Sequence, residues 1–398
     1  MSLLSTRIQS IKPSPTLEIT QLAQELKAKG KKIISLSAGE PDFDTPHFIK
    51  EAAWEALQQG YTKYTAVDGI IELKKAIQAK FKTDNALAYA TDEIIVGCGA
   101  KHVLFNAFMV TLNKGDEVII PTPFWPSYPY IVTLCDGTPI IVACPQFKIT
   151  ADQLEKAITP HTKWLLLNSP NNPSGAIYSK EELAALADVI RKHPHVYVMS
   201  DDIYEHIRYD GVPFYTFAQV APDLKDRTLT INGVSKSFSM TGWRIGYAAG
   251  PKEIIKAMAK LQSQSTSNPT SISQYAAAAG LSHSGEFLTE NNQLFLERRD
   301  MVVRMLNDSP GLMCATPPGA FYVYPSCAGV LGKKTPDGKR IESDKDFAAY
   351  LLEAAEVAIV PGVAFGLSPF FRLSYAEDTP LLEKACKRIQ TACTALKD

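Results

Sequence analysis

Short apolar segments rich in valine, isoleucine and leucine recur between residues 94 and 250, and they limit most strongly what this chain can fold into. Because they show little polar alternation, we expect strands that are buried on both faces, and helical stretches such as 179–193 lie between several of them. This order is typical of an α/β fold with a mostly parallel central sheet and helices on both faces. The predicted strands end at Gly97, Pro123, Pro145, Pro170, Asp202, Gly233 and Gly250.

The two ends of the chain show a different order of elements, which predicts a smaller α+β domain beside the large one. Helical spacing predicts helices at 16–30, 46–60, 69–82, 287–308 and 380–393, and further strands are expected at 319–325 and 370–376. We therefore expect three parts. They are an N-terminal arm and helix that belong to the small domain (1–47), a large domain (48–290) and a small C-terminal domain (291–398).

Composition excludes several functions for a chain of 398 residues, of which 45% are hydrophobic. Lys+Arg number 41 and Asp+Glu 42, with no basic stripe, so we expect no nucleic-acid partner. The N-terminus and the later apolar segments predict neither secretion nor a membrane span. Seven scattered cysteines indicate free thiols in a reducing, cytoplasmic compartment, and the seven histidines show no metal-binding spacing.

Ligands of an open parallel sheet bind beyond the carboxyl ends of its strands, so the residues at those ends are the first candidates for a site. The turn Gly99–Lys101, which includes Ala100, opens a helix whose free backbone N–H groups can hold a phosphate, although taken alone this stretch is better explained as a plain strand-to-helix turn. Trp125 is either a core residue or a stacking wall for a planar ligand. Asn172 stands in an Asn-Pro-x-Gly turn after the strand that ends at Pro170.

Asp201 and Lys236 follow two later strands and carry the most reactive side chains of this set. Asp201 is either a helix cap or a carboxylate that pairs with a cationic ring nitrogen. Most lysines are merely solvated, but a desolvated lysine becomes a neutral amine that forms a Schiff base with a carbonyl. A phosphate turn, an aromatic wall, an acid and such a lysine are together the demands of one cofactor, pyridoxal 5'-phosphate.

Six stretches of the sequence resemble, in order, the signature stretches of the class I aminotransferases of pyridoxal-phosphate fold type I. They are AGEPDFDTP, SPNNPSGAIY, SDDIYE, SKSFSMTGWRIGY, PPGAFYVYP and RLSYA. The resemblance covers nearly the whole chain and is closest to the bacterial aspartate aminotransferase branch, which also contains prephenate aminotransferases. It implies that residues 48–290 form the domain that binds pyridoxal phosphate.

The resemblance also implies a role for individual residues around the cofactor. Lys236 matches the Schiff-base lysine, and Asp201 the partner of the pyridine nitrogen. Tyr204 and Asn172 match the hydrogen bonders to the ring hydroxyl, and Trp125 the stacking ring. The phosphate is then held by the matches Gly99, Ala100, Lys101 and Arg244, and by Tyr64 of a neighbouring subunit, which implies a homodimer with shared active sites.

For the substrate, the resemblance implies that Arg372 binds the α-carboxylate with two parallel donors, and that the backbone of Gly39 contacts the same group. Trp125 and Asn172 also border the substrate. Lys12 and Lys101 match the lysines thought to meet the distal carboxylate of a dicarboxylic substrate. In this reading Lys236, Asp201 and Tyr204 form the catalytic group.

The activity expected from this resemblance is ping-pong transfer of the amino group of L-aspartate to 2-oxoglutarate, which gives oxaloacetate and L-glutamate. The alternative is a prephenate or aromatic amino acid aminotransferase, and less favoured is a lyase of the same fold. A non-catalytic ligand sensor that kept the fold is a further alternative, but all residues needed for the chemistry are present.

Overall fold

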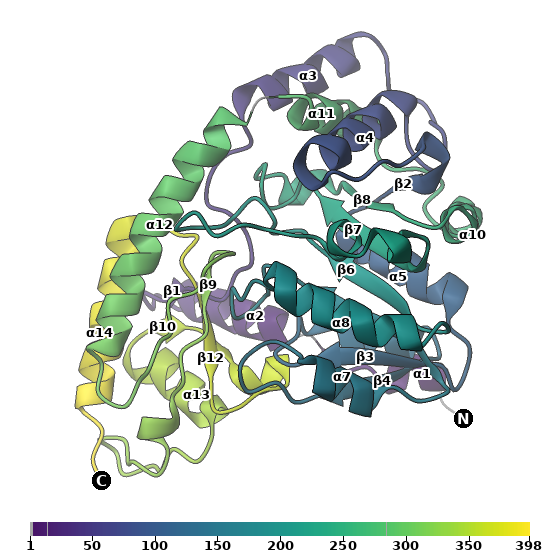
Figure 1. Cartoon of the computed structure of the whole chain (residues 1–398). Helices are drawn as coiled ribbons and strands as arrows, with labels where there is room; N and C mark the ends of the chain where they lie inside the picture. The colour runs from purple at the N-terminus through teal and green to yellow at the C-terminus, as the bar shows by residue number, and fades with distance from the viewer. Residues whose placement is uncertain (1–2, 14, 284) are drawn as a thin grey trace.

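A seven-stranded sheet forms the centre of the molecule (Figure 1), as seen in a computed structural model that describes residues 3–13, 15–283 and 285–398. The strand order is β2-β8-β7-β6-β5-β3-β4. The strands are β2 (Ile94–Gly97), β3 (Glu117–Pro121), β4 (Thr138–Val142), β5 (Thr162–Asn168), β6 (Tyr197–Asp201), β7 (Thr228–Gly233) and β8 (Gly246–Ala249). Strands β4, β3, β5, β6 and β7 pair in parallel, and only β8 runs antiparallel to its two neighbours.

Helices cover both faces of this sheet. Alternate residues of each strand point to opposite faces, and since both sets are apolar, each face is buried against helices. Val118 and Ile120 of β3 pack in one apolar cluster with helices α5 (Ala100–Thr111), α6 (Ser127–Leu134) and α10 (Lys252–Ser263). Ile119, between them, packs in another with α7 (Ala151–Ala157) and α8 (Lys180–Lys192). The predicted mostly parallel sheet with helices on both faces is confirmed.

Helices α3 (His47–Gln58), α4 (Ile71–Asn85) and α11 (Ser271–Leu281) cover the end of the sheet that holds β2 and β8. Leu73, Ile77 and Phe81 of α4 lie on one side of that helix and pack with Ile94 and Val96 of β2. This spacing of four residues places the three side chains on one face of the helix, which is the pattern from which the sequence predicted α4.

A second apolar core lies around two small sheets built from the chain ends (Figure 1). Strand β1 (Ile34–Ser35) pairs with β10 (Val357–Ala358), and β12 (Phe371–Ser374) lies between β11 (Val360–Pro361) and β9 (Tyr322–Val323). The helices here are α2 (Pro15–Ala28), α12 (Glu286–Asn307), α13 (Asp344–Ala354) and α14 (Thr379–Thr394). Helix α2 packs on β1 and β10, as expected. The division of the chain at residues 47 and 290 stays a prediction.

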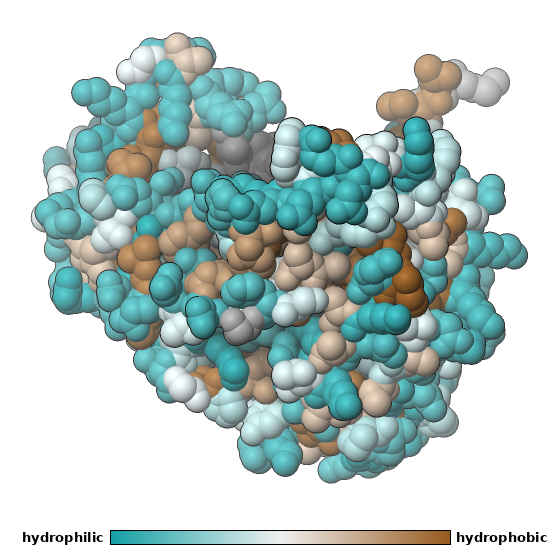
Figure 2. Space-filling view, turned by 90° about the horizontal axis from the view of Figure 1, so that it is seen from above, coloured by the Kyte–Doolittle hydropathy of each residue, from teal (hydrophilic) through white to brown (hydrophobic). Residues whose placement is uncertain are grey.

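The surface is mainly polar on the face that Figure 2 shows, with apolar residues in small separate groups. Two short helices, α1 (Thr6–Gln9) and α9 (Phe217–Val220), complete the set of α-helices among the described residues. None of the helices described is both long enough and apolar enough to cross a bilayer.

Candidate active site

A cavity of about 470 Å³ lies at the carboxyl ends of β5, β6 and β7, where the seven-stranded sheet meets the second core. Asn168 ends β5, Asp201 ends β6, and Lys236 follows the end of β7 by three residues. All three line the cavity. The predicted site residues that border it are Gly39, Ala100, Lys101, Trp125, Asn172, Asp201, Tyr204, Lys236, Arg244 and Arg372.

Lys236 projects into this cavity from the loop after β7, and its Nζ donates a hydrogen bond to the backbone oxygen of Gly39 at 2.6 Å. Burial lowers the pKa of Lys236 to about 8, and the positive charges of Arg372 and Arg244 act in the same direction. The carboxylate of Glu40 opposes this shift. The neutral amine, which is the form that attacks a carbonyl, is therefore far more populated near neutral pH than in an ordinary solvated lysine.

Asp201 is a buried carboxylate, only 4% exposed, that reaches the cavity from the end of β6. Its Oδ2 accepts a hydrogen bond from the hydroxyl of Tyr128 at 2.6 Å, and its Oδ1 accepts a long one from the N–H of Ile203 at 3.4 Å. Burial raises the pKa of Asp201 to about 6, and the hydrogen bond from Tyr128 limits the rise. The group is thus ionised at pH 7 and can pair with a protonated ring nitrogen.

Aromatic side chains form two walls of the cavity. Tyr204 and Tyr322 share a hydrogen bond between their hydroxyls at 2.8 Å, and both are buried. Trp125 packs edge-on against Tyr128, with ring centroids 5.3 Å apart, while the Nζ of Lys101 lies 4.7 Å from the Trp125 ring. A flat ligand can stack on Trp125 while the Tyr204 hydroxyl bonds to its edge.

The start of helix α5 and Arg244 form a cradle for an anion at one end of the cavity. Gly99, with φ of 91°, precedes the helix, so the N–H groups of its first turn point outward. A Cβ added at Gly99 would lie 2.9 Å from Cζ of Arg244, so a larger residue would displace this guanidinium from the turn. Positive charge on Arg244 and the helix N-terminus together suit a phosphate.

Arg372, 2% exposed, is a buried cation at the other end of the site. Its Nη1 donates to Oδ1 of Asn172 at 3.0 Å and its Nη2 to the backbone oxygen of Ser37, and the guanidinium faces the ring of Tyr322 at 4.6 Å. Among the described residues, Nε has no hydrogen-bond partner and no carboxylate pairs with this arginine. Burying a guanidinium that has no acidic partner costs free energy, unless a ligand carboxylate binds to it.

These residues fit pyridoxal phosphate. The glycine-lined cradle at Arg244 suits its phosphate, Asp201 its ring nitrogen, Tyr204 its ring hydroxyl, and Lys236 its aldehyde. The unsatisfied Nε of Arg372 leaves a place for a substrate carboxylate beside it.

Two predicted residues lie elsewhere on the described surface. Tyr64 is 90% exposed, and Lys12 is exposed on the N-terminal arm. Neither is among the described residues that line the cavity. Gly99 is not among them either, but it lies next to the guanidinium of Arg244, which does line the cavity.

Sequence reasoning missed further cavity residues: Glu40, Ser127, Tyr128, Ser235 and Tyr322. Tyr322 lies inside the quoted stretch PPGAFYVYP, so its motif was a usable signal. Tyr128 gave no signal, because its partner Asp201 is 73 residues away and the contact depends on the fold.

The known proteins that this chain resembles agree with the geometry of the site. The chain matches the family model described as aminotransferase class I and II over residues 31–389. It is 58% identical over 395 residues to the aspartate aminotransferase of Rhizobium meliloti (strain 1021), covering 98% of this chain and 96% of that protein. It is 56% identical to a probable aspartate/prephenate aminotransferase of Rhizobium leguminosarum bv. phaseoli, and 100% of both chains are covered. The crystal structure of the aspartate aminotransferase from Rhizobium meliloti matches with a TM-score of 0.98 and 56% identity over 100% of both chains.

Proposed function

Because the chain belongs to the class I and II aminotransferases, which use pyridoxal phosphate, we propose that it moves the amino group of L-aspartate to 2-oxoglutarate by a ping-pong mechanism. The observation that carries this proposal is the arrangement of three groups around one cavity. Lys236 is a lysine with a lowered pKa, Asp201 is a buried carboxylate, and Arg372 is a buried guanidinium without an acidic partner among the described residues.

The chain's own residues divide the work of such a reaction. When bound, pyridoxal phosphate supplies an aldehyde that takes up amino groups and a ring that accepts the electrons left by a departing proton. Arg372 holds the substrate α-carboxylate and so fixes the orientation of Cα. Lys236, next to Gly39, is placed to remove the proton from Cα and return it as general base and acid. Asp201 keeps a positive charge on the ring nitrogen, and Tyr204 holds the ring hydroxyl.

The dicarboxylic substrate class rests on Lys101, which lines the cavity with its Nζ 4.7 Å from the centroid of the Trp125 ring. A cation in the first turn of α5 is unfavourable for the helix dipole, and burial together with the charge of Arg244 lowers its pKa. A distal substrate carboxylate near Lys101 would offset both costs. Lys12, on the exposed arm, is the second proposed contact, and it would act across the subunit boundary.

A second candidate is transamination of prephenate with glutamate or aspartate as donor. It is favoured by the 56% identity to a protein described as a probable aspartate/prephenate aminotransferase. Prephenate also carries two carboxylates, so Arg372 and Lys101 serve either substrate in this proposal.

The experiment that separates these functions is a titration of the visible absorbance of the holoenzyme with single amino donors. We expect aspartate and glutamate to convert the cofactor form at low concentration, and conversion by arogenate would favour the second candidate. Conversion by alanine or phenylalanine in preference to every dicarboxylate would contradict the proposal.

Two variants test the assignment of the carboxylate-binding residues. Arg372→Ala should raise KM for every amino and keto acid, whereas Lys101→Ala should raise KM only for dicarboxylates. A uniform effect of Lys101→Ala would instead assign this lysine to the phosphate.

We also propose that the enzyme is a homodimer in the cytoplasm. The support for a dimer is Tyr64, because a tyrosine with 90% exposure gains most by contact with a second copy. The support for the compartment is that all seven cysteines are free thiols, and six of them are buried.

A further inference from the structure

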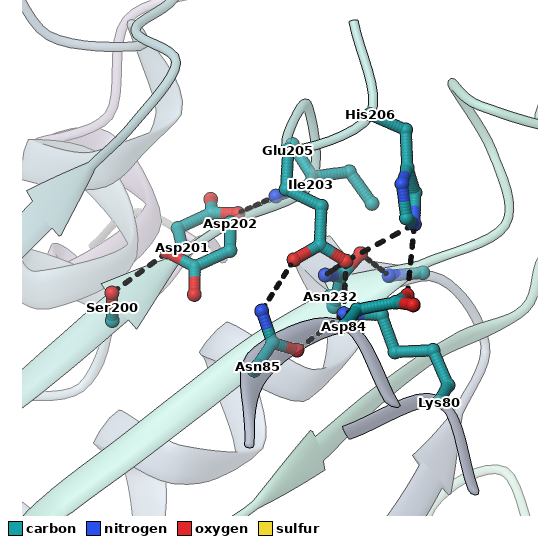
Figure 3. Close-up of polar contacts among 11 residues, drawn as sticks. Lys80, Asp84, Asn85, Ser200, Asp201, Asp202, Ile203, Glu205, His206 and Asn232 are labelled. Carbon is teal, nitrogen blue, oxygen red and sulfur yellow. Dashed lines mark hydrogen bonds and ion pairs between the residues drawn. The ribbon is translucent and has the colours of Figure 1, made fainter. Parts of the chain in front are cut away.

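Glu205 is a buried acid on the same turn as Asp201 and Tyr204, but it points away from the cavity that they line. The turn follows β6, and Asp201 and Tyr204 face the cavity. Figure 3 shows the carboxylate of Glu205 directed toward Asn85, Asn232 and Lys80, none of which is among the described lining of the cavity. Its side chain is 3% exposed, so its charge has to be balanced inside the protein.

Both oxygens of Glu205 are fully engaged by groups from other elements. Oε1 accepts a hydrogen bond from Nδ2 of Asn232 at 2.8 Å and forms an ion pair with Nζ of Lys80, whose side chain is also 3% exposed. Oε2 accepts a hydrogen bond from Nδ2 of Asn85 at 3.0 Å. The ring Nε2 of His206 lies 3.3 Å from Oε1. Burial acts to raise the pKa of Glu205, but Lys80 and His206 outweigh it and hold this pKa well below the usual range.

These partners tie together three segments that flank the site. Lys80 and Asn85 belong to the last turns of α4, and Asn232 belongs to the end of β7. The side-chain oxygen of Asn232 also accepts a hydrogen bond from the N–H of Gly233 at 2.7 Å, which fixes the end of the strand that leads to Lys236. The same network thus holds the turn of Asp201 and Tyr204 and the strand end before Lys236.

A metal ion does not account for this cluster. Ligand atoms of Asp84, Glu205 and His206 lie within 4.8 Å of one another, but the ammonium of Lys80 already occupies the cation position beside Glu205. It also donates to Oδ1 of Asn85 at 2.7 Å and lies 3.8 Å from Oδ2 of Asp84. A divalent cation would have to displace a buried, fully bonded lysine.

We propose that Glu205, through its ion pair with Lys80, is a positioning residue for the reaction. It holds the turn after β6 in the position in which Asp201 and Tyr204 contact the cofactor ring while Lys236 reaches the cofactor aldehyde. This inference rests on the roles proposed for those three residues. A displacement of about 1 Å at such a turn is enough to cost up to 10²-fold in rate.

The test uses the holoenzyme with Glu205→Gln and the double variant Lys80→Met/Glu205→Gln. A glutamine keeps the volume but removes the buried carboxylate that pairs with Lys80, which then keeps only the more distant Asp84, and its amide cannot accept hydrogen bonds from both asparagines. We expect kcat to fall about 10- to 100-fold with a much smaller change of KM. We also expect the pH midpoint of the visible cofactor absorbance to move by about half a unit or more. In the double variant the melting temperature should recover, because the buried ammonium is removed together with the carboxylate that balanced it. The loss of kcat and the shifted midpoint should persist.

The matched control is Lys74→Met on the same helix. Lys74 is 6% exposed and pairs with Asp68, and neither residue is among the described residues that line the cavity. Its removal should lower the melting temperature and leave the pH midpoint of the absorbance unchanged.

Three results would overturn the inference. The first is a wild-type pH midpoint and kcat in both Glu205 variants. The second is an equal midpoint shift in Lys74→Met, and the third is loss of folding in both Glu205 variants, since the pair would then serve the fold alone. Failure of the Lys236 assignment is distinguishable, because the wild-type protein itself would then lack a lysine-linked cofactor absorbance.

Discussion

Asp201 is a carboxylate that the protein buries at an energetic cost, which indicates a function other than stability. Its pKa is about 6 in the folded chain, above the ordinary 3.8. A raised pKa means that the chain without cofactor loses stability as pH rises from about 4 through 6, because the ionised form is disfavoured there.

Removing the charge of Asp201 should therefore stabilise the chain without cofactor at high pH. Asp201→Asn without cofactor should melt at a higher temperature than the wild type at pH 8, and the difference should vanish near pH 4. The holoenzyme should behave in the opposite way, with weaker cofactor binding and a kcat about 10²- to 10³-fold lower. Thermal melts at both pH values, with and without cofactor, check it, and a variant that is less stable at pH 8 without cofactor would contradict it.

At the residue scale, the sequence predicted the site residues that lie at strand ends. A strand end can be recognised in a sequence because a polar residue follows an apolar run. Asp201 and Lys236 were visible in this way. Glu40, Tyr128 and Glu205 were not, because their roles depend on contacts with side chains far along the chain or on the direction of one turn.

At the scale of elements, the turn before α5 is the part of the site that depends most on backbone shape. Gly99→Ala places a Cβ against Arg244 and puts alanine at a φ of 91°. We expect the dissociation constant for pyridoxal phosphate to rise about tenfold or more, because both the cradle and the guanidinium shift.

The control for this variant is Gly115→Ala. Gly115 has a φ of 98° and no atom within 4 Å of an added Cβ, so it shares the backbone strain without the collision. Cofactor titration of both variants measures the difference, and equal affinities would show that Arg244 and the turn do not hold the phosphate.

Element positions were largely predictable, and their directions were less so. All seven strands of the central sheet were predicted from apolar runs. The antiparallel direction of β8 was not stated, although the connection from β7, residues 234–245, contains no α-helix and a parallel return usually passes through one.

At the scale of the whole molecule, the central proposal is that two chains share their active sites. Tyr64 lies on the outer surface of one chain, away from the described lining of that chain's own cavity. If it serves the neighbouring site, Tyr64→Ala and Lys236→Ala are both inactive or weak alone but complement each other in a mixed dimer.

The measurement is the activity regained after an equal mixture of these two variants is unfolded and refolded together. Random pairing restores one native site in each mixed dimer, so about a quarter of all sites should be active. Activity no higher than the mean of the separate variants would contradict a shared site.

The most direct test of the account is the covalent state of Lys236. Borohydride reduction of the wild-type holoenzyme should fix the cofactor to the peptide that contains this lysine, as read by mass spectrometry, and Lys236→Ala should show neither the adduct nor the visible lysine-linked absorbance. An adduct on a different lysine, or an unchanged absorbance in Lys236→Ala, would contradict the account.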